Sequence, residues 1–573
     1  MKAWESSAAI ELRMIPLSRT ASAALFVAVF FFMSLRIASH KSTSIRTQQQ
    51  IALLNRASGT LESLNTSGII GSNEPPPLPR EICVGWCPPK ISALDRVVRS
   101  IDCSTHTIQE HVRAAMQMEN CPSAVQSDQN AREVESKLFK LAENDAFVFF
   151  RGAAGFFDID LMCMDPDFQG KKRSMPRVVS NGDAHPANFG TQVMVNGKLM
   201  WGVNDFDQSF ATPFSWDLKR GATGTEVACR ARGWNDVVCK ASASAFIGAY
   251  LDIAAKPNVS TIVVSNQDRF LEGSRATESD DILVQLFKRA RKSETDEEIL
   301  RWLRDDLNVD TEKDRFFQTS VTTPLPDEVV PEFQAAIEAY LFHGVPAVVM
   351  YPWGEFWKVL AVAKRSGSGT GSIGLNRFYV LLRGKKSTYG GRIVLEMKQE
   401  VHSLLEMFFR YKYTESEQGK RAVDAVRGAY PYTNPFYGWT TLRGRPYIVR
   451  EKSKHEKSVK FEELSAEEYL DYSVLCGRAL AMYHFKMQCP DHDCALDANA
   501  NVDRETWSSV SDYINGYGRQ DFQTMITNFA FKETERQIQA WDWLRTIVRQ
   551  TKARNESPLW LLNLQLPGVD TYC

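Results

Sequence analysis

A short polar segment, residues 178–188, constrains the fold of this chain more than any other stretch. It reads Val-Val-Ser-Asn-Gly-Asp-Ala-His-Pro-Ala-Asn, so an apolar, strand-like start leads into a loop that carries Asp183 and Asn188. Glycine and proline punctuate this loop and keep a helix or a strand from continuing through it. The segment therefore predicts a buried strand whose end presents a carboxylate and an amide.

A second polar motif follows at a short distance. The stretch 199–203 is apolar and strand-like, and the Asp-Phe-Asp triplet 205–207 comes soon after it. A carboxylate at a strand end suits Mg²⁺, which keeps several waters and needs few hard oxygen donors. Phosphoryl transfer requires a carboxylate that orients a hydroxyl and oxygen ligands that hold a metal ion. The two motifs together indicate this chemistry, although a single aspartate in such a place is more often a turn or cap residue.

A glycine-rich run lies much later in the chain. Gly369, Gly371 and Gly374 form a G-x-G-x-x-G pattern between two strand-like stretches, 357–362 and 377–382. In a dinucleotide-binding fold such glycines open a helix, whereas kinases cover phosphates with a glycine-rich loop. The strand-like neighbours therefore favour a phosphate-covering hairpin, and a plain glycine turn is the alternative.

The next strand-like stretch, 392–398, ends in Lys398. A lysine in this place pairs with nucleotide phosphates in kinases and is itself held by a glutamate, and an exposed strand-end lysine is the alternative. Glu400 and Glu406 both stand near enough in the chain to be that carboxylate. The stretch 444–452 predicts a further strand, against whose backbone an adenine would pack. These features predict a site for ATP with Mg²⁺.

Apolar spacing divides the body of the chain into helical and strand-rich parts. The segment 147–152, Phe-Val-Phe-Phe-Arg-Gly, predicts a short buried strand that ends in a turn, and the block 356–451 is rich in strands. Helical spacing predicts helices over 131–141, 234–254, 280–303, 327–343, 465–486 and 522–549. The expected class is α+β, with a strand-rich and a helical lobe.

Length and composition bound the architecture. The chain has 573 residues, 24% of them charged and 44% hydrophobic, which excludes wholesale disorder and exceeds one typical domain. The net charge of -1 gives no global attraction to nucleic acid, and no such partner is expected. We expect an N-terminal tail and signal anchor (1–36), a stalk (37–90), a helical lobe with the catalytic loop and metal site (91–350), a strand-rich nucleotide-binding lobe (351–455) and a C-terminal helical region that completes the helical lobe (456–573).

The N-terminus carries a membrane signal. Residues 20–35 are uncharged and mostly apolar and lie between Arg19 and Arg36. The run is short for a plasma-membrane helix, and no clear cleavage site follows it, so a single-pass signal anchor is expected, with a secreted protein after signal cleavage as the alternative. Basic residues on both sides leave the topology open.

The eleven cysteines favour a body in an oxidising lumen of the secretory pathway. Asn65, Asn258 and Asn555 begin formal glycosylation triplets, which would make the chain a glycoprotein. The group Cys489, His492 and Cys494 has no second ligand pair at matching spacing, so zinc binding there is the less favoured interpretation.

These motifs carry two resemblances. The loop and the Asp-Phe-Asp triplet resemble the catalytic loop and metal site of aminoglycoside phosphotransferases and choline kinases, with Asn181 where those enzymes have a leading His. The chain resembles more closely the mainly bacterial domain of unknown function 2252 family, whose biochemical activity is not established. That resemblance covers roughly 60% of the chain and rests on 149–154 (FFRGAA), 182–190 (GDAHPANFG), 204–207 (NDFD) and 216–220 (WDLKR).

The resemblance implies a role for each residue of the two polar motifs. Asp183 would be the catalytic base, and His185 would orient it or be merely structural. Asn188 and Asp205 would be the metal ligands, and Asp207 a second or alternative one. The glycine run and the later lysine would bind the nucleotide phosphates.

The resemblance also implies a protein-kinase-like fold in circularly permuted order, because the catalytic loop precedes the glycine run and Lys398. The family tends to follow this lysine with Glu where Gln399 stands. Asp217 would brace the helical lobe. Arg151 would pair with a buried carboxylate, which is the preferred interpretation, or contact phosphate.

We therefore expect a membrane-anchored, kinase-like phosphotransferase that uses ATP and Mg²⁺ to modify a hydroxyl acceptor whose identity the sequence does not reveal. The alternatives are a pseudokinase or nucleotide-binding regulatory scaffold, and a nucleotidyl (AMP) transferase on the same fold. The permuted arrangement makes one geometric demand. Lys398 has to lie within about 15 Å of Asp205, a gap that ordinary lobe closure bridges, although the two are far apart in the chain.

Overall fold

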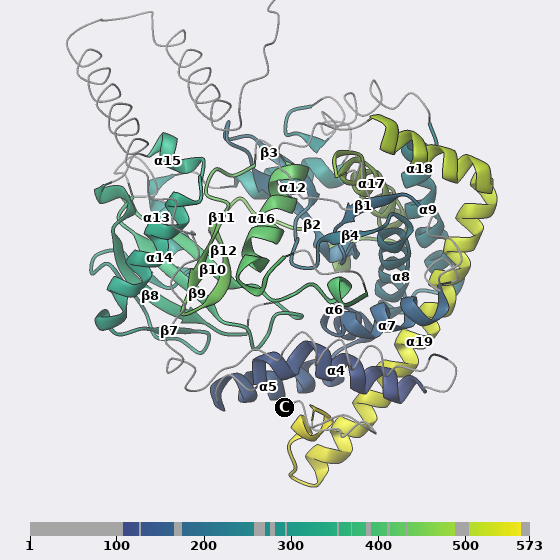
Figure 1. The fold of residues 1–573 in the computed structure, drawn as a ribbon, viewed down its shortest axis with the longest axis horizontal. Coiled ribbons are helices and arrows are strands. Elements are labelled where there is room, and N and C mark those ends of the chain that lie inside the picture. The colour runs from purple at the N-terminus through teal and green to yellow at the C-terminus, as the bar shows by residue number, and fades with distance from the viewer. Residues whose placement is uncertain are drawn as a thin grey trace, which may run out of the picture. The chain divides into compact units, whose positions relative to one another are not determined.

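The structure is a computed structural model, and it describes residues 103, 107–124, 128–165, 175–256, 270–274, 281–292, 295–351, 354–367, 369–384, 391–408, 413–430, 433–487 and 504–562 (Figure 1). The expected tail, anchor and stalk, the acceptors Asn65 and Asn258, and the Cys489, His492 and Cys494 group lie outside these residues.

The described part of the chain is α+β, as the sequence predicts. Its helices are α4 (Ile108–Ala124), α5 (Asp128–Glu143), α6 (Ala146–Gly152), α7 (Ala154–Met164), α8 (Ser215–Ala231), α9 (Asp236–Ala254), α12 (Asp281–Arg291), α13 (Asp296–Asp305), α14 (Val330–Phe342), α15 (Ala347–Met350), α16 (Gln418–Ala429), α17 (Ala466–Lys486), α18 (Arg504–Tyr517) and α19 (Arg519–Ala553). Its strands are β1 (Arg177–Ser180), β2 (Phe189–Val193), β3 (Leu199–Val203), β4 (Phe210–Pro213), β5 (Val309–Asp310), β6 (Arg315–Phe316), β7 (Thr322–Pro324), β8 (Val359–Arg365), β9 (Arg377–Leu382), β10 (Ile393–Gln399), β11 (Gly438–Leu442) and β12 (Arg445–Glu451).

The helical part is built around α8, α9 and α17, which pack on one another, and the long α19 runs along α8 and α9 (Figure 1). Their shared core is rich in aromatic and aliphatic side chains, including Phe214, Phe246 and Tyr250. Two short antiparallel ribbons, β1 with β4 and β2 with β3, rest on this core. They carry the two polar motifs at their ends.

The strand-rich part is a six-stranded antiparallel sheet in the order β11-β12-β10-β9-β8-β7. Every residue of β10 is buried, as expected for an inner strand covered on both faces. One face packs against α14 through Leu395, Met397 and their neighbours. Because β7 belongs to this sheet and α14 packs on it, the strand-rich part begins before the expected boundary at residue 351.

The segment 147–152 is a helix, so the predicted strand is wrong. Asp145 caps this helix, α6, by accepting a hydrogen bond from the Val148 backbone N–H at 2.9 Å. Its phenylalanine side chains are buried among other helices, with Phe149 and Phe150 fully enclosed. A short apolar run that is buried on all sides has no period that distinguishes a strand from a helix. Here the side-chain cap at Asp145 favours the helix, because it satisfies a backbone N–H group of the first turn.

The helix predicted over 280–303 is two helices, α12 and α13. Thr295 begins the second one with a capping box, in which its side chain and that of Glu298 satisfy each other's backbone N–H groups. A capping box satisfies N–H groups that an uninterrupted helix would bond internally, and so it favours a new start. The other predicted helices are present, with ends shifted by a few residues.

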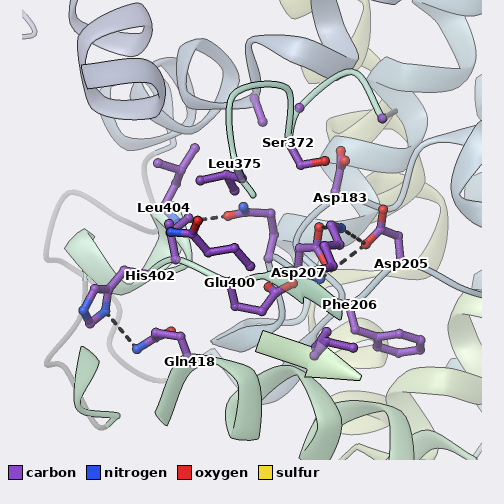
Figure 2. A pocket seen from close by; sticks show the side chains of 18 of the residues that line it. Asp183, Asp205, Phe206, Asp207, Ser372, Leu375, Glu400, His402, Leu404 and Gln418 are labelled. Atoms are coloured by element: carbon purple, nitrogen blue, oxygen red, sulfur yellow. Dashed lines mark hydrogen bonds and ion pairs between the residues drawn. The ribbon is translucent and has the colours of Figure 1, made fainter. Parts of the chain in front are cut away.

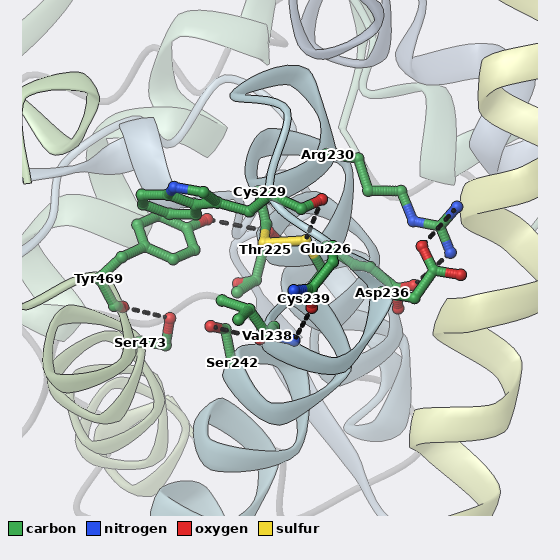
Figure 3. The surroundings of a disulfide bond; sticks show 12 residues. Thr225, Glu226, Cys229, Arg230, Asp236, Val238, Cys239, Ser242, Tyr469 and Ser473 are labelled. Carbon is green, nitrogen blue, oxygen red and sulfur yellow. Dashed lines mark hydrogen bonds and ion pairs between the residues drawn. A yellow bond between two sulfur atoms is a disulfide. The ribbon is translucent and has the colours of Figure 1, made fainter. Parts of the chain in front are cut away.

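Two disulfides join described cysteines, Cys103 to Cys163 and Cys229 to Cys239. The second links the end of α8 to the start of α9, beside the ion pairs of Arg230 (Figure 3). Among the described helices, α9 alone is long and apolar enough to cross a bilayer, and 56% of its apolar window is buried in the body. Packing against α8 and α17 accounts for its apolar composition.

Candidate functional site

A cavity of about 330 Å³ lies between the two polar motifs and the sheet (Figure 2). This volume lies at the lower end of the range of small-molecule sites. Of the residues to which the sequence assigns a catalytic, metal-binding or phosphate-binding role, all but Gly374 line it, namely Asp183, His185, Asn188, Asp205, Asp207, Gly369, Gly371 and Lys398. Segments about two hundred positions apart in the chain therefore meet in one place.

The loop after β1 is held from behind by Asp217. The Asp217 carboxylate accepts hydrogen bonds from the backbone N–H of Asn181 at 2.6 Å and of Gly182 at 2.9 Å. His484, from α17, lies 3.0 Å from the same carboxylate. Gly182 has a φ of +81°, and a Cβ there would lie 2.3 Å from the Gln208 carbonyl, so only glycine fits. Asp217 thus braces the helical part, as expected, and it does so at the loop after β1.

Both carboxylate oxygens of Asp183 accept hydrogen bonds from neighbouring side chains. Arg220 donates to Oδ1 from Nε at 3.0 Å and from Nη2 at 2.8 Å. His185 Nε2 lies 3.3 Å from Oδ2, and Asn188 Nδ2 donates to the same oxygen at 3.1 Å. Burial raises the pKa of Asp183, but His185 and Arg220 more than reverse this effect and hold the pKa well below its ordinary value. The carboxylate is therefore ionised at neutral pH and suited to orienting a hydroxyl, because a strongly acidic group is a weak proton acceptor.

Sequence reasoning missed Arg220. Its side chain is buried, donates to the Phe150 carbonyl at 2.9 Å, and lies 3.7 Å from the centre of the Phe150 ring. One signal was available, because Lys219 and Arg220 stand side by side in the WDLKR stretch on which the family resemblance rests. Buried cations need partners, and Lys219 has one in Asp165, at 2.5 Å.

The Asp-Phe-Asp triplet meets Lys398. The Lys398 Nζ contacts Asp207 Oδ2 and lies 3.8 Å from Asp205 Oδ1. The predicted proximity of Lys398 and Asp205 is thus confirmed. Neither Glu400 nor Glu406 is the ion-pair partner, because the lysine points across the cavity to the other polar motif. We call Asp183, Asp205 and Asp207 the carboxylate cluster.

Glu400 nevertheless stays close to this group. It lines the cavity, and its Oε1 atom is buried without a hydrogen-bond partner among the described residues. Burial raises the pKa of Glu400 to about 7, although Lys398 opposes the shift. Gln399 also lines the cavity, and its side chain accepts hydrogen bonds from the backbone and side-chain nitrogens of Asn376.

A second buried arginine, Arg421, fixes the backbone of the triplet. From α16 it donates to the carbonyls of Asp207 and Ser209, both at 2.7 Å, and to that of Val401 at 3.2 Å. Its Nε donates to Gln418. The helix that follows the lysine strand is thereby tied to both sides of the cavity, a contact between distant segments that no local pattern predicts.

The glycine run forms the connection between β8 and β9 that the sequence predicts. Helix α5 holds it from outside the cavity. Lys137 Nζ donates to the Gly371 carbonyl at 2.9 Å, and Asn130 Nδ2 donates to the Gly374 carbonyl at 2.6 Å. In a trans peptide the N–H points away from the C=O, so the Ser372 N–H points away from Lys137. Ser372 itself lines the cavity.

The cavity face of β12 is mixed, because Pro446 and Ile448 line the cavity with apolar side chains and Arg450 lines it with a charged one. Glu396 on β10 lies between Arg377 Nη1 at 3.0 Å and Arg450 Nε at 2.8 Å. Both arginines line the cavity, and Glu396 itself is fully buried. We call Arg377 and Arg450, with Glu396 between them, the arginine pair.

Arg151 also lines the cavity, and the preferred interpretation of this residue is wrong. It makes no ion pair with a carboxylate in the part of the chain that the structure describes. Its guanidinium lies 5.7 Å from the centre of the Phe147 ring, and its Nε has no hydrogen-bond partner there. The alternative, a phosphate contact, stays a prediction.

The donor set at the carboxylate cluster fits Mg²⁺. Asn188 uses its Nδ2 on Asp183, which leaves its amide oxygen as an acceptor. The side chain of Asp205 is 43% exposed and meets Lys398 at 3.8 Å. Among the described residues, no group of three or more His, Cys, Asp or Glu side chains is placed to hold a metal ion, so an ion here would also need Asn188 and water as ligands. A few oxygen ligands completed by water are what Mg²⁺ prefers.

Comparison with known proteins gives one match. A family model described as "Uncharacterized protein conserved in bacteria (DUF2252)" matches residues 129–546, which include every residue of the cavity except two on α4. No curated protein and no solved structure is similar to the chain.

Proposed function

The chain belongs to the uncharacterized bacterial DUF2252 family, and from this premise and the cavity we propose that it transfers a phosphoryl group from ATP to a hydroxyl acceptor. Under this proposal the cavity holds ATP with Mg²⁺. The family match by itself indicates no activity, so the proposal depends on the geometry of the cavity residues.

One observation carries the proposal. Lys398, at the end of a sheet strand, lies 3.8 Å from Asp205, which follows a strand of the helical part. A lysine that grips phosphate and a carboxylate that holds a metal can serve one nucleotide only when they face the same small space. The glycine run, Asp183 and Asn188 line that space as well.

The chain's own residues have distinct roles in this proposal. Asn188 and Asp205 would hold Mg²⁺, which neutralises charge on the phosphates. Lys398 would leave Asp207 and pair with phosphate oxygens. Asp183 would orient the acceptor hydroxyl, whose oxygen bonds to the terminal phosphorus as the bond to the ADP oxygen breaks. The hydroxyl proton would pass to solvent, because Arg220 keeps Asp183 a weak base.

The order of elements supports a kinase-like, circularly permuted fold. A glycine turn joins the first two strands of the run β8, β9 and β10, and the third ends in the lysine, as in kinases. The carboxylate motifs precede this run in the chain instead of following it. Chain ends at a surface allow such a permutation.

We further propose that residues 20–35 anchor the protein and that its body lies in an oxidising lumen. The apolar run supports the first point. The two disulfides and the exposed acceptor Asn555 support the second. Carbonate extraction and a glycosidase shift of the full-length protein test the two points separately.

The activity is tested by incubating the full-length protein with Mg²⁺ and ATP labelled at the γ or the α position, in the presence of protein, sugar and lipid acceptors. The proposal expects ADP release and γ-label transfer that Asp183→Asn abolishes. Transfer of α-label instead would indicate a nucleotidyl transferase. Nucleotide binding with neither product would indicate a regulatory scaffold, and no binding at all would end the proposal.

A further inference from the structure

The arginine pair lies where the sheet forms one wall of the cavity. Residues two apart on a strand share a face, so Glu396 and Lys398 both point from β10 toward the same side. Glu396 stands opposite Arg450 of β12, and Lys398 stands opposite Arg377 of β9. This face of the sheet therefore presents a row of charged side chains beside Lys398, at a distance of about 7 Å along the strand.

The charges of this group do not cancel. Burial raises the pKa of Glu396, but Lys452, Arg450 and Arg377 more than reverse this effect and hold the pKa well below its ordinary value. Glu456 adds a second carboxylate, which lies 3.9 Å from Arg450 and 3.8 Å from Lys452. Three cations and two carboxylates leave one net positive charge. The two arginines keep donors to spare. Besides Glu396, Arg377 donates only to Ser372 Oγ, at 3.1 Å, and Arg450 only to Tyr437, at 3.3 Å, within the described residues.

A nucleobase is a poor occupant for the part of this wall that carries Arg377 and Arg450, whereas Pro446 and Ile448 line the cavity with apolar side chains. Aromatic ligands are held mainly by apolar side chains, and covering a charged group with a flat ring removes water without replacing its hydrogen bonds. Arginine forks match phosphate oxygens in geometry and in charge. Ser372 of the glycine run touches Arg377, so a phosphate there would also lie near the backbone N–H groups of that run.

We propose that the arginine pair forms an anion subsite that binds a phosphate group in the cavity. The inference rests on the proposed function only in taking the cavity as a nucleotide site. The phosphate belongs either to the nucleotide's own chain, which spans the gap from Lys398, or to a phosphorylated acceptor.

The test is a calorimetric titration of the full-length protein with tripolyphosphate and, separately, with adenosine. Arg450→Met and Arg377→Met should each weaken tripolyphosphate binding by about tenfold, the loss of one charge-assisted contact. Glu396→Gln should strengthen it several-fold, because it leaves both arginines less neutralised. Adenosine affinity should not follow this pattern. Arg443→Met is the matched control, because it removes an exposed arginine at the end of the same hairpin.

The subsite predicts that tripolyphosphate affinity falls in the two arginine variants and rises in the glutamate variant. A merely structural role predicts that all three variants lose affinity together. Equal losses, or no change beyond that of Arg443→Met, would overturn the subsite. Should Glu396→Gln fail to fold, as judged by its melting curve, the two arginine variants still decide.

Lys398→Met and Asp205→Ala separate this inference from the proposed function. Dependence on Lys398 without dependence on Arg450 rejects the subsite and leaves the proposed function standing. The reverse result keeps the subsite and rejects the proposed function. Inorganic phosphate that displaces ATP with Mg²⁺ assigns the subsite to the nucleotide's chain, and phosphate that binds together with ATP assigns it to a phosphorylated acceptor.

Discussion

The carboxylate cluster and the arginine pair line one cavity but are built in opposite ways. The cluster consists of loop side chains at strand ends, with Asp205 43% and Asp207 23% exposed. The arginine pair stands on the inner strands of the sheet around a fully buried Glu396. Under the proposed function the exposed loop carboxylates would exchange a lysine for a metal, whereas the sheet holds its charges in fixed positions. In the proposed complex, carboxylates of the helical part would hold the metal ion and cationic side chains of the sheet would hold the phosphates. The Asp205 and Lys398 variants below each test one of these two groups.

The largest effect is expected at Asp183. Asp183→Asn should reduce transfer by about 10³-fold while nucleotide affinity stays within about twofold, because the side chain acts on the acceptor and not on ATP. The asparagine oxygen still accepts from Arg220, so the loop should keep its shape. Initial rates and calorimetric titrations measure the two quantities.

Asp158→Asn is the control for this variant. Asp158 is buried nearby on α7, and burial raises its pKa to about 8, so it is mostly neutral at pH 7 and does not line the cavity. A comparable loss of transfer in both variants would mean that Asp183 supports the fold and not the reaction.

Asp205→Ala should remove the Mg²⁺-dependent part of nucleotide binding. With ligand at 100 times its dissociation constant, binding stabilises the wild type by about 2.7 kcal/mol. We expect the variant to show a melting temperature with ATP that no longer differs between Mg²⁺ and EDTA. Since Asp205 is partly exposed, the melting temperature without ligand should hardly change, which serves as the internal control.

Lys398→Met should have a smaller effect, and the affinities for ATP and for Mg²⁺ should change in opposite directions. The loss of one phosphate contact should weaken the affinity for ATP by about tenfold. The same change frees Asp205 and Asp207 from a cation, so Mg²⁺ alone should bind the variant more tightly than the wild type. Titrations with ATP and with Mg²⁺ measure both. If Mg²⁺ affinity is unchanged, the carboxylates near Lys398 are not the metal site.

The last prediction concerns stability and its dependence on pH in the absence of ligand. Burial raises the pKa of Asp158 from its ordinary value of 3.8 to about 8, although Arg220 opposes the shift. Between these two values the folded state binds more protons than the unfolded state, so the wild type loses stability as pH rises, by up to about 1.4 kcal/mol per pH unit. The asparagine of Asp158→Asn does not titrate, so the melting temperature of this variant should rise relative to that of the wild type between pH 5 and pH 8. A constant difference across this range would show that Asp158 is ionised in the fold.

The sequence predicted the carboxylate cluster well because its members are local. Asp183 and Asn188 occupy one loop, and Asp205 follows a strand whose bounds, 199–203, the structure reproduces. The glycine run and Lys398 were found from strand-like neighbours on both sides. Their meeting with the cluster was an inference from chemistry, since both must reach one phosphate chain.

The remaining parts of the site depend on contacts that no local pattern records. Arg377, Glu396 and Arg450 come from three strands and form one group only through the register of the sheet. Arg220 and Arg421 reach the polar loops from helices far along the chain. Helix α6 was predicted as a strand for a different reason, because burial on all sides removes the period that distinguishes a helix from a strand.

The most direct test of the account is an experimental structure of the full-length protein with Mg²⁺ and a non-hydrolysable ATP analogue. The account predicts a metal on Asp205 and Asn188, the Lys398 ammonium moved from Asp207 to a phosphate oxygen, and phosphate within hydrogen-bond distance of the arginine pair. A nucleotide bound outside this cavity, or one inside it while Lys398 still pairs with Asp207 and no metal touches Asp205, would contradict it.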